Sequence, residues 1–216
     1  MGCDSIILCV EVKSAVDSKH LQRWGQNLQQ AIPTCTSVFR LHASDKHDSS
    51  KPYRDQYLIN LENPEALTQA TIEHLRSESS TLFSSSDWNI YHEIARRSRP
   101  GLDGNEYPPT GTEYVQVGMD PTLASTQDYL DWFDQEHQGM LAEVPGWRGT
   151  RRYRLVSSHG SGREHAALFL SASEYDVENG LGGPIWQRSI DTPWTGRVRE
   201  NLARPYHRRT WKFVPL

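Results

Sequence analysis

The sequence is poor in the residues that build disulfide or metal centres. Its 216 residues include three cysteines without paired spacing, and no N-glycosylation sequon occurs. Such cysteine usage is typical of a reducing compartment, so we expect a cytoplasmic protein without a disulfide framework. His159, Glu164 and His165 flank one glycine-containing loop, but their spacing matches no familiar zinc pattern, and no metal site is predicted.

Long apolar runs and excess positive charge are also missing. No apolar segment approaches the roughly 18 residues that span a bilayer. The formal net charge of −4 does not favour nucleic acid or an anionic membrane surface. The apolar run 5–12 lacks a preceding basic region and fits a strand better than a signal peptide, and Ile6 occupies the position where a myristoylation signal needs Ser or Thr. We therefore expect neither a membrane partner nor a nucleic-acid partner.

Motifs for cofactor binding and for nucleophilic catalysis are absent as well. The glycines at 160–162 and 180–183 lack the full spacing of a dinucleotide or phosphate loop. The sequence also has no serine nucleophile elbow, no paired-cysteine motif and no Walker motif. No nicotinamide, flavin or nucleotide cofactor is therefore expected.

What the sequence does contain is one order of elements, repeated twice. In the first half, periodicity predicts strands over 6–12, 37–42, 56–63 and 87–94, and helices over 19–31 and from Pro64 to about residue 76. In the second half it predicts strands over 113–119, 151–156, 165–171 and 208–214, a helix over 127–144, and a helical stretch that Pro193 divides. The segment 97–111 is rich in Pro and Gly, has no periodicity, and is interpreted as a linker.

This order of strand, helix, strand, strand, helix, strand is the ferredoxin-like pattern. Each copy should form a four-stranded antiparallel sheet with helices on one face, and the two uncovered faces can bury each other. We therefore predict an α+β protein in which tandem ferredoxin-like units, residues 1–96 and 112–216, form an intramolecular dimeric α+β barrel. A further association into a homodimer is left open.

The helix predicted over 127–144 carries a histidine on its apolar face. Its three-and-four spacing gives a stripe of Leu130, Phe133, His137, Met140, Leu141 and Val144. His137 is either a hydrogen-bonded core histidine or the lining of a pocket beneath the helix. Aligning Pro33 with Pro145 places Gly25 opposite His137, so a pocket would belong mainly to the second half.

An arginine-rich strand follows this helix. Alternation places Arg151 and Tyr153 on one face and Arg152 and Arg154 on the other. Arg152 or Arg154 could orient a substrate carboxylate or enolate, although a surface ladder of ion pairs is an equal alternative. We take His137, Tyr153 and Arg152 as the catalytic candidates.

Aromatic residues are plentiful around this helix and favour a hydrophobic substrate. His92 is an additional candidate because it shares a strand face with Trp88 and Ile90, which predicts that it points inward. The alternative is that these side chains only fill the core. The substrate-binding candidates are Tyr114, Tyr129, Phe133, Met140, Trp147, Trp186, Trp194 and His92.

Two segments of the second half carry a family likeness. DYLDWFDQEHQGMLAEVPGWRGTRRYRLV and EYDVENGLGGPIWQRSIDTPWTGRV resemble the EthD-type branch of the dimeric α+β barrel superfamily, including fungal members of natural-product pathways. The resemblance implies the barrel fold and a pocket between helices and sheet, with a histidine of the first helix as acid or base, the place that His137 matches. The superfamily's chemistry spans polyketide cyclases, monooxygenases without cofactor, decarboxylases and haem-dependent peroxidases.

The expected function is that of an enzyme of secondary metabolism. We expect a cofactor-independent cyclase that closes a ring in a polyketide- or terpenoid-like intermediate, by an aldol-type or a pericyclic step such as a Diels–Alder cycloaddition. One alternative is a decarboxylase or dehydratase of the same pathway class. The other is a non-catalytic protein that binds an apolar ligand. In each case the partner is a small hydrophobic molecule.

Overall fold

The computed structural model describes residues 4–13, 16–46, 51, 53–63, 67–102, 108–160 and 166–216. The strands in these ranges are β1 (Asp4–Val12), β2 (Cys35–Ala43), β3 (Asp55–Leu61), β4 (Phe83–Ser98), β5 (Glu113–Met119), β6 (Trp147–His159), β7 (Phe169–Tyr175) and β8 (His207–Val214). The helices are α1 (Ser18–Ala31), α2 (Gln69–Glu78), α3 (Thr126–Trp132), α4 (Gln138–Ala142), α5 (Pro184–Ile190) and α6 (Pro193–Glu200). Two short 3₁₀ turns, η2 (Ser79–Thr81) and η3 (Leu123–Ser125), and a π-turn, η4 (Phe133–His137), complete the described elements.

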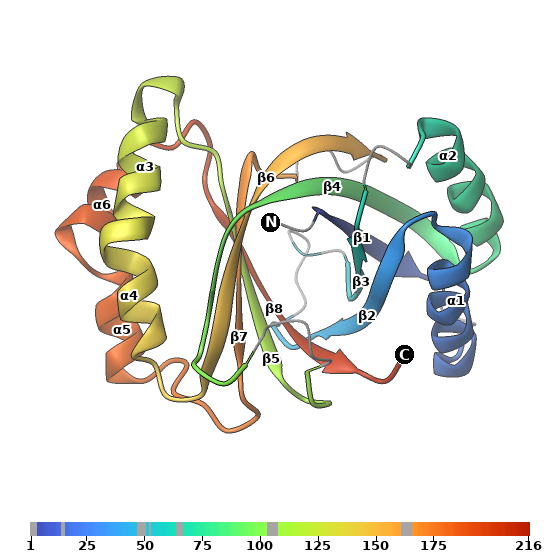
Figure 1. Ribbon diagram of the computed structural model, residues 1–216, viewed down its shortest axis with the longest axis horizontal. Helices are drawn as coiled ribbons and strands as arrows, with labels where there is room; N and C mark the ends of the chain where they lie inside the picture. Colours follow the sequence, from blue (N-terminus) through green and yellow to red (C-terminus); the bar gives the residue numbers. More distant parts are fainter. Residues whose placement is uncertain are drawn as a thin grey trace.

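The strands close into one antiparallel barrel in the order β1-β3-β2-β8-β5-β7-β6-β4. Within each half the order is that of a ferredoxin-like sheet, β4-β1-β3-β2 and β8-β5-β7-β6. The halves join where β2 pairs with β8 and where β4 pairs with β6. Helices α1 and α2 lie on one side of the barrel and α3 to α6 on the opposite side (Figure 1). The predicted fold class is confirmed.

Strand alternation separates the barrel interior from the helix-covered faces. On β5, Tyr114 and Gln116 point into the barrel, whereas Val115 packs beneath the helices. Inside the barrel the Gln56 and Gln116 amides bond to each other at 3.1 and 2.8 Å, and Trp211 Nε1 donates to Gln116 Oε1 at 2.9 Å. These three side chains, which come from both halves, therefore satisfy one another.

Helix α1 packs directly on its sheet at the position aligned with His137. Its N-cap is Asp17, whose side chain accepts from the His20 backbone N–H, and Leu28 is buried on its inner face. A Cβ added to Gly25 would lie 2.5 Å from Leu216 Cδ1 and 2.8 Å from Tyr57 Cε1. The first half therefore has no room for a side chain where the second half has a histidine.

Several element boundaries differ from the sequence-based prediction; the strand predicted over 165–171, for example, is β7, Phe169–Tyr175. Helix α2 begins at Gln69 because the Thr68 hydroxyl caps it by accepting from the Thr71 N–H, whereas the predicted start at Pro64 lies outside the described residues. Strand β4 continues to Ser98, since it pairs with β6 as far as Gly149. The single helix predicted over 127–144 is instead α3, η4 and α4.

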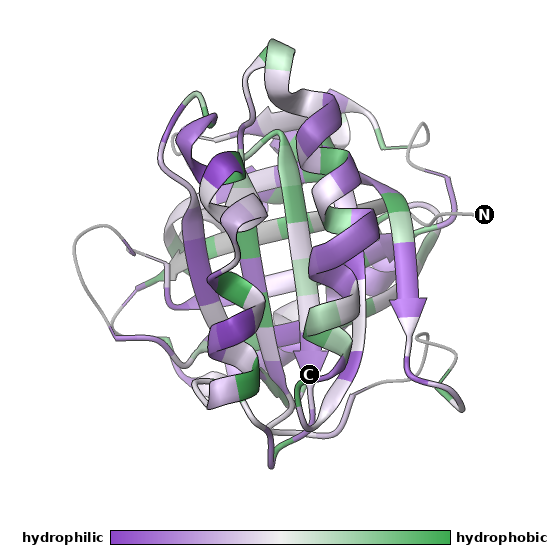
Figure 2. Ribbon diagram, turned by 90° about the vertical axis from the view of Figure 1, so that its left-hand side faces the viewer, coloured by the Kyte–Doolittle hydropathy of each residue, from purple (hydrophilic) through white to green (hydrophobic). Residues whose placement is uncertain are grey.

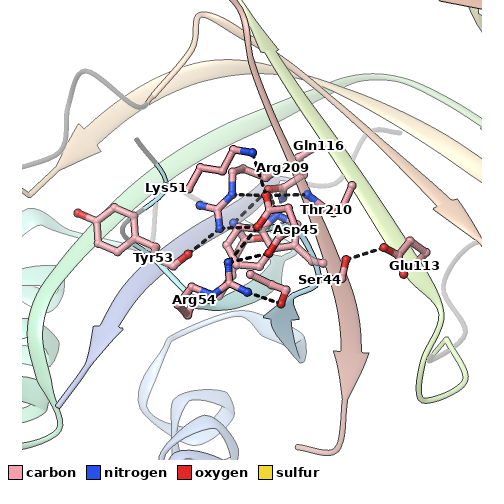
Figure 3. Close-up of polar contacts among 12 residues, drawn as sticks. Ser44, Asp45, Lys51, Tyr53, Arg54, Glu113, Gln116, Arg209 and Thr210 are labelled. Atoms are coloured by element: carbon pink, nitrogen blue, oxygen red, sulfur yellow. Dashed lines mark hydrogen bonds and ion pairs between the residues drawn. The ribbon is translucent and has the colours of Figure 1, made fainter. Parts of the chain in front are cut away.

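A cluster of charged side chains stabilises the junction between β2 and β8, as Figure 3 shows. Asp45, which follows β2, accepts from Arg209 Nε at 2.8 Å, from Arg54 Nη1 at 3.1 Å and from the Thr210 N–H at 3.4 Å. Lys51 Nζ lies 3.9 Å away. Burial opposes ionisation of Asp45, but hydrogen bonding and the charge of Arg209 outweigh it and hold its pKa below the usual value. An ionised Asp45 thus ties the last strand to the first half.

No helix in the described ranges is long and apolar enough to cross a bilayer.

Candidate functional site

The helix above the second sheet is interrupted by the π-turn η4. Its defining hydrogen bond runs from the Gln138 N–H to the Phe133 carbonyl, five residues back. The extra residue in this turn shifts the helical phase, so that residues five apart come to lie one above the other. The rings of Trp132 and His137 stack as a result, with centroids 4.2 Å apart and an interplanar angle of 19°. Isolated π-turns of this kind are frequent at functional sites.

The His137 ring is held in one tautomer. Its Nδ1 lies 2.9 Å from the Ser189 carbonyl oxygen, and because a carbonyl can only accept, Nδ1 carries the proton. Burial lowers the pKa of His137 to about 4, and the charge of Arg199 adds to this effect, against the opposing hydrogen bond to Ser189. At neutral pH the ring is uncharged, and its Nε2 lone pair has no partner among the described residues.

A chain of polar groups positions the indole on which His137 rests. Trp132 Nε1 donates to Thr195 Oγ1 at 3.2 Å, and the Thr195 and Thr192 hydroxyls lie 2.9 Å apart. Thr192 Oγ1 in turn donates to the Glu136 carboxylate at 2.6 Å. The chain joins α6 to the π-turn, so both the stacking surface and the imidazole are fixed before any ligand arrives.

A cavity of about 140 Å³ lies beneath these helices, and His137 is part of its wall. Figure 2 shows the two helical segments, α3–α4 and α5–α6, running side by side across the strands of the second half. The volume is close to that of the ~150 Å³ cavities that hold one benzene ring. Its apolar wall is formed by Val115, Val117, Met119, Leu141 and Ile190.

Two cations and an exposed aromatic ring also line the cavity, together with Ser171, Ser173 and Tyr175. The Arg199 guanidinium lies over the Tyr206 ring at 5.2 Å, and that of Arg208 lies over the Trp186 ring at 5.4 Å. Tyr206 is 41% exposed, so it forms the solvent edge of the cavity. The site therefore combines an apolar chamber, a neutral imidazole and two guanidinium groups.

The structure does not bring the three catalytic candidates together. His137 lines the cavity, whereas Tyr153 is fully buried in the barrel interior on the opposite face of β6. Arg152 shares the helix-facing side but bonds to Asp134 and lies over the Phe133 ring at 4.7 Å, next to a separate open hollow. Tyr153 and Arg152 lie on opposite faces of β6, as alternation predicts, and neither lines the cavity that contains His137.

Only one substrate-binding candidate, Trp186, lines the same cavity as His137. Phe133 lies edge-on to the His137 ring at 5.3 Å, and Met140 is half-buried outside the lining. The expectation that His92 points inward is wrong, because its side chain is exposed. The remaining candidates contribute to packing or to hydrogen bonds elsewhere: Tyr114 in the barrel, Tyr129 against Phe169, Trp147 to Thr150, and Trp194 to Asp128.

Sequence reasoning missed the polar half of the site. Thr195, Val198 and Arg199 share one helical face, a pattern visible in the sequence once α6 is placed. Alternation also puts Arg208 on the face of β8 opposite Trp211. Tyr206 lies between α6 and β8, where no helix or strand periodicity indicates which side chains face the cavity.

The described residues hold no group of three or more His, Cys, Asp or Glu side chains placed to bind a metal ion. Glu164 and His165 lie outside those residues.

The depressed pKa of His137 predicts a specific loss of stability in acid. Its pKa is about 4 in the fold against 6.5 for the free side chain, so its stabilising contribution is complete above pH 6.5 and is lost as the pH falls towards 4. The expected loss attributable to this group is about 3 kcal/mol. Urea denaturation at pH 7.5 and 4.5 should show the wild type losing about 2–3 kcal/mol more than His137→Leu. Parallel losses in both proteins would contradict the buried, neutral imidazole.

Comparison with solved structures finds the same fold across nearly the whole chain. An anthrone oxidase-like protein superimposes with a TM-score of 0.70 at 16% identity, covering 99% of this chain and 91% of the other. A proposed monooxygenase from Fusobacterium nucleatum subsp. nucleatum superimposes with a TM-score of 0.63 at 7% identity, covering 98% of this chain and 92% of the other. A mutant chlorite dismutase from Candidatus Nitrospira defluvii, in complex with cyanide, superimposes with a TM-score of 0.59 at 10% identity, covering 99% of this chain and 91% of the other.

These likenesses, at such low identity, establish a ferredoxin-like dimeric α+β barrel and no more. No protein-family model and no curated protein sequence matches the chain. Membership of the EthD-type branch stays a prediction.

Proposed function

We propose that this protein is an enzyme of small-molecule, secondary metabolism in which His137 takes a proton from an enolisable carbon of the substrate. The observation that carries the proposal is the unpartnered Nε2 of a neutral, tautomer-fixed imidazole in the wall of an apolar cavity. At neutral pH its lone pair is already free, but a pKa of about 4 makes it a weak base, so we expect it to act on strongly activated C–H groups such as one between two carbonyls. The enolate carbon then attacks a carbonyl carbon of the same molecule, and the new C–C bond closes a ring. The alkoxide formed takes up the proton from His137.

The size of the cavity sets the part of the substrate that enters it. One aromatic or enone ring fits about 140 Å³. The remainder of a polyketide- or terpenoid-like chain would pass the solvent edge at Tyr206. Binding in a narrow chamber also restricts the chain to folded shapes near the geometry of attack, which favours cyclisation.

A second candidate is oxygenation of the same enolate without a bound cofactor. It is favoured by the similar structures, which include an anthrone oxidase-like protein and a proposed monooxygenase. After proton removal the carbanion is oxidised by molecular oxygen, which converts a CH₂ group into C=O and releases one water per O₂ consumed. His137 would supply the same proton transfer in both reactions.

The test separates proton removal from the fate of the enolate. A phenyl-substituted 1,3-diketone in D₂O should exchange its acidic C–H faster with the protein than without it, followed by NMR. Longer polyketone analogues then report ring closure by product analysis and oxygenation by O₂ uptake. Release of CO₂ identifies a decarboxylase, and loss of water without O₂ uptake identifies a dehydratase. Binding of every analogue without accelerated exchange or product formation would leave a non-catalytic binding protein.

A further inference from the structure

The cavity beneath α3–α4 contains two arginines whose charge nothing in the described chain neutralises. No ion pair or side-chain hydrogen bond joins the Arg199 or Arg208 guanidinium to a described residue, and no described Asp or Glu lines the cavity. The Arg199 Nε is fully buried without a partner. An unpaired guanidinium at a partly buried site is costly to the free protein, and a bound anion removes that cost.

The two carboxylates that attract Arg208 are already bonded to other residues. Asp45 and Glu113 act on Arg208 only through longer-range attraction. Asp45 is held by Arg209 at the β2–β8 junction, and Glu113 accepts from the Ser44 hydroxyl at 2.5 Å. Neither carboxylate therefore serves as a resident counter-ion for the cavity.

The two guanidinium groups are fixed against aromatic rings. Arg208 lies over Trp186, and Arg199 lies over Tyr206, so each cation has a preferred position but keeps N–H donors available. Planar guanidinium groups match planar carboxylates in bidentate hydrogen bonds. Apolar walls beside them suit an aromatic or alkenyl body.

We propose that the cavity recognises an amphiphilic organic acid, a molecule with one unsaturated ring or chain in the apolar chamber and a carboxylate bound by Arg199 and Arg208. This proposal names the substrate class of the proposed enzyme, and its relevance to catalysis rests on the proposed function. It also orients the substrate, because anchoring the carboxylate at the cationic wall fixes which carbon faces His137. The negative charge further favours protonation of His137 when it accepts the proton.

Binding of trans-cinnamate and its neutral isostere trans-cinnamamide, measured by calorimetry at pH 7.5, tests the proposal. Wild-type protein should bind the acid more tightly than the amide by about tenfold or more. Arg199→Gln and Arg208→Gln should each weaken binding of cinnamate more than binding of cinnamamide and so reduce this preference, and Arg208→Lys should restore part of it. Arg197→Gln is the matched control, because Arg197 is on the same helix but exposed and paired with Asp128.

Three outcomes would overturn the proposal: equal affinity for acid and amide, an equal loss in the Arg197 control, or no binding of cinnamate at millimolar concentration. The His137→Ala variant separates this proposal from the proposed function. If it keeps the preference for the acid and loses turnover, both stand. If it keeps the preference and the full turnover, acid recognition stands and the base assignment falls.

Discussion

Replacing His137 with alanine is expected to lower turnover by about 10²–10⁴-fold, the usual contribution of a general base. Among the described residues, the cavity wall offers no other general base: its hydroxyls are weak bases, and guanidinium groups carry no free lone pair. Truncating His137 leaves the Trp132 indole held by Thr195, so the helix keeps its main contact. The measurements are deuterium exchange and product formation, with thermal unfolding to confirm that the variant is folded.

The matched control for this variant is His92→Ala, which removes an exposed histidine from β4 and should leave turnover unchanged. The pH profile gives an independent check. With a pKa of about 4 for His137 in the free enzyme, kcat/KM should stay level through pH 6.5 and fall only near pH 4, once ionisation of the substrate itself is accounted for. Full activity of His137→Ala would remove the base from the mechanism and leave a shape-driven pericyclic closure as the surviving form of cyclisation.

The site depends on a local departure from regular helix geometry. An uninterrupted α-helix would place Glu136, four residues after Trp132, above the indole. The π-turn gives that place to His137 instead and turns Glu136 towards Thr192. One inserted residue therefore creates both the stacked imidazole and the polar chain that holds its support.

The fold could be predicted because its signals are local. Strand alternation and helix periodicity located β1, α1 and β5 closely, and the repeated order of elements predicted two ferredoxin-like sheets with open faces. Burying those faces against each other then requires a barrel. The start of α2 was placed wrongly because Pro64 and Thr68 both resemble helix starts, and the cap at Thr68 prevails in the structure.

The site was predictable only in part, for a physical reason. His137 stood out because a titratable residue on an apolar stripe is unusual, whereas Arg199 and Arg208 come from elements that only the tertiary fold brings to it. The arginines of β6 looked equally suited to an anion, yet Arg152 is taken up by Asp134. Aromatic content was a poor guide, since Tyr114 and Trp147 serve the core. Composition cannot distinguish a ring that fills space from one that borders it.

The junction between the halves gives the largest expected effect on stability. Asp45→Ala should lower the free energy of unfolding by about 3 kcal/mol, the lower end of the range for a buried pair, because it leaves partly buried cations without their counter-ion. Asp45 is 8% exposed and Arg209 12%, and with Asp45 absent the neighbouring Arg54 and Arg209 repel each other across the gap. Urea denaturation at pH 7 measures the change, and Glu143→Ala, an exposed acid at the end of α4, serves as the control.

Substitutions of Asp45 also test whether the β2–β8 junction holds Arg208 in its place in the cavity. Arg209 and Arg208 are adjacent on β8 and point to opposite faces, so the bond to Asp45 inside fixes the strand that presents Arg208 to the cavity. Asp45→Asn, which keeps the size but removes the charge, should lose less stability than Asp45→Ala and should weaken cinnamate binding under conditions where the protein stays folded. Unchanged stability in Asp45→Ala would mean that pairing of β2 with β8 and the aromatic interior suffice to close the barrel without the ion cluster.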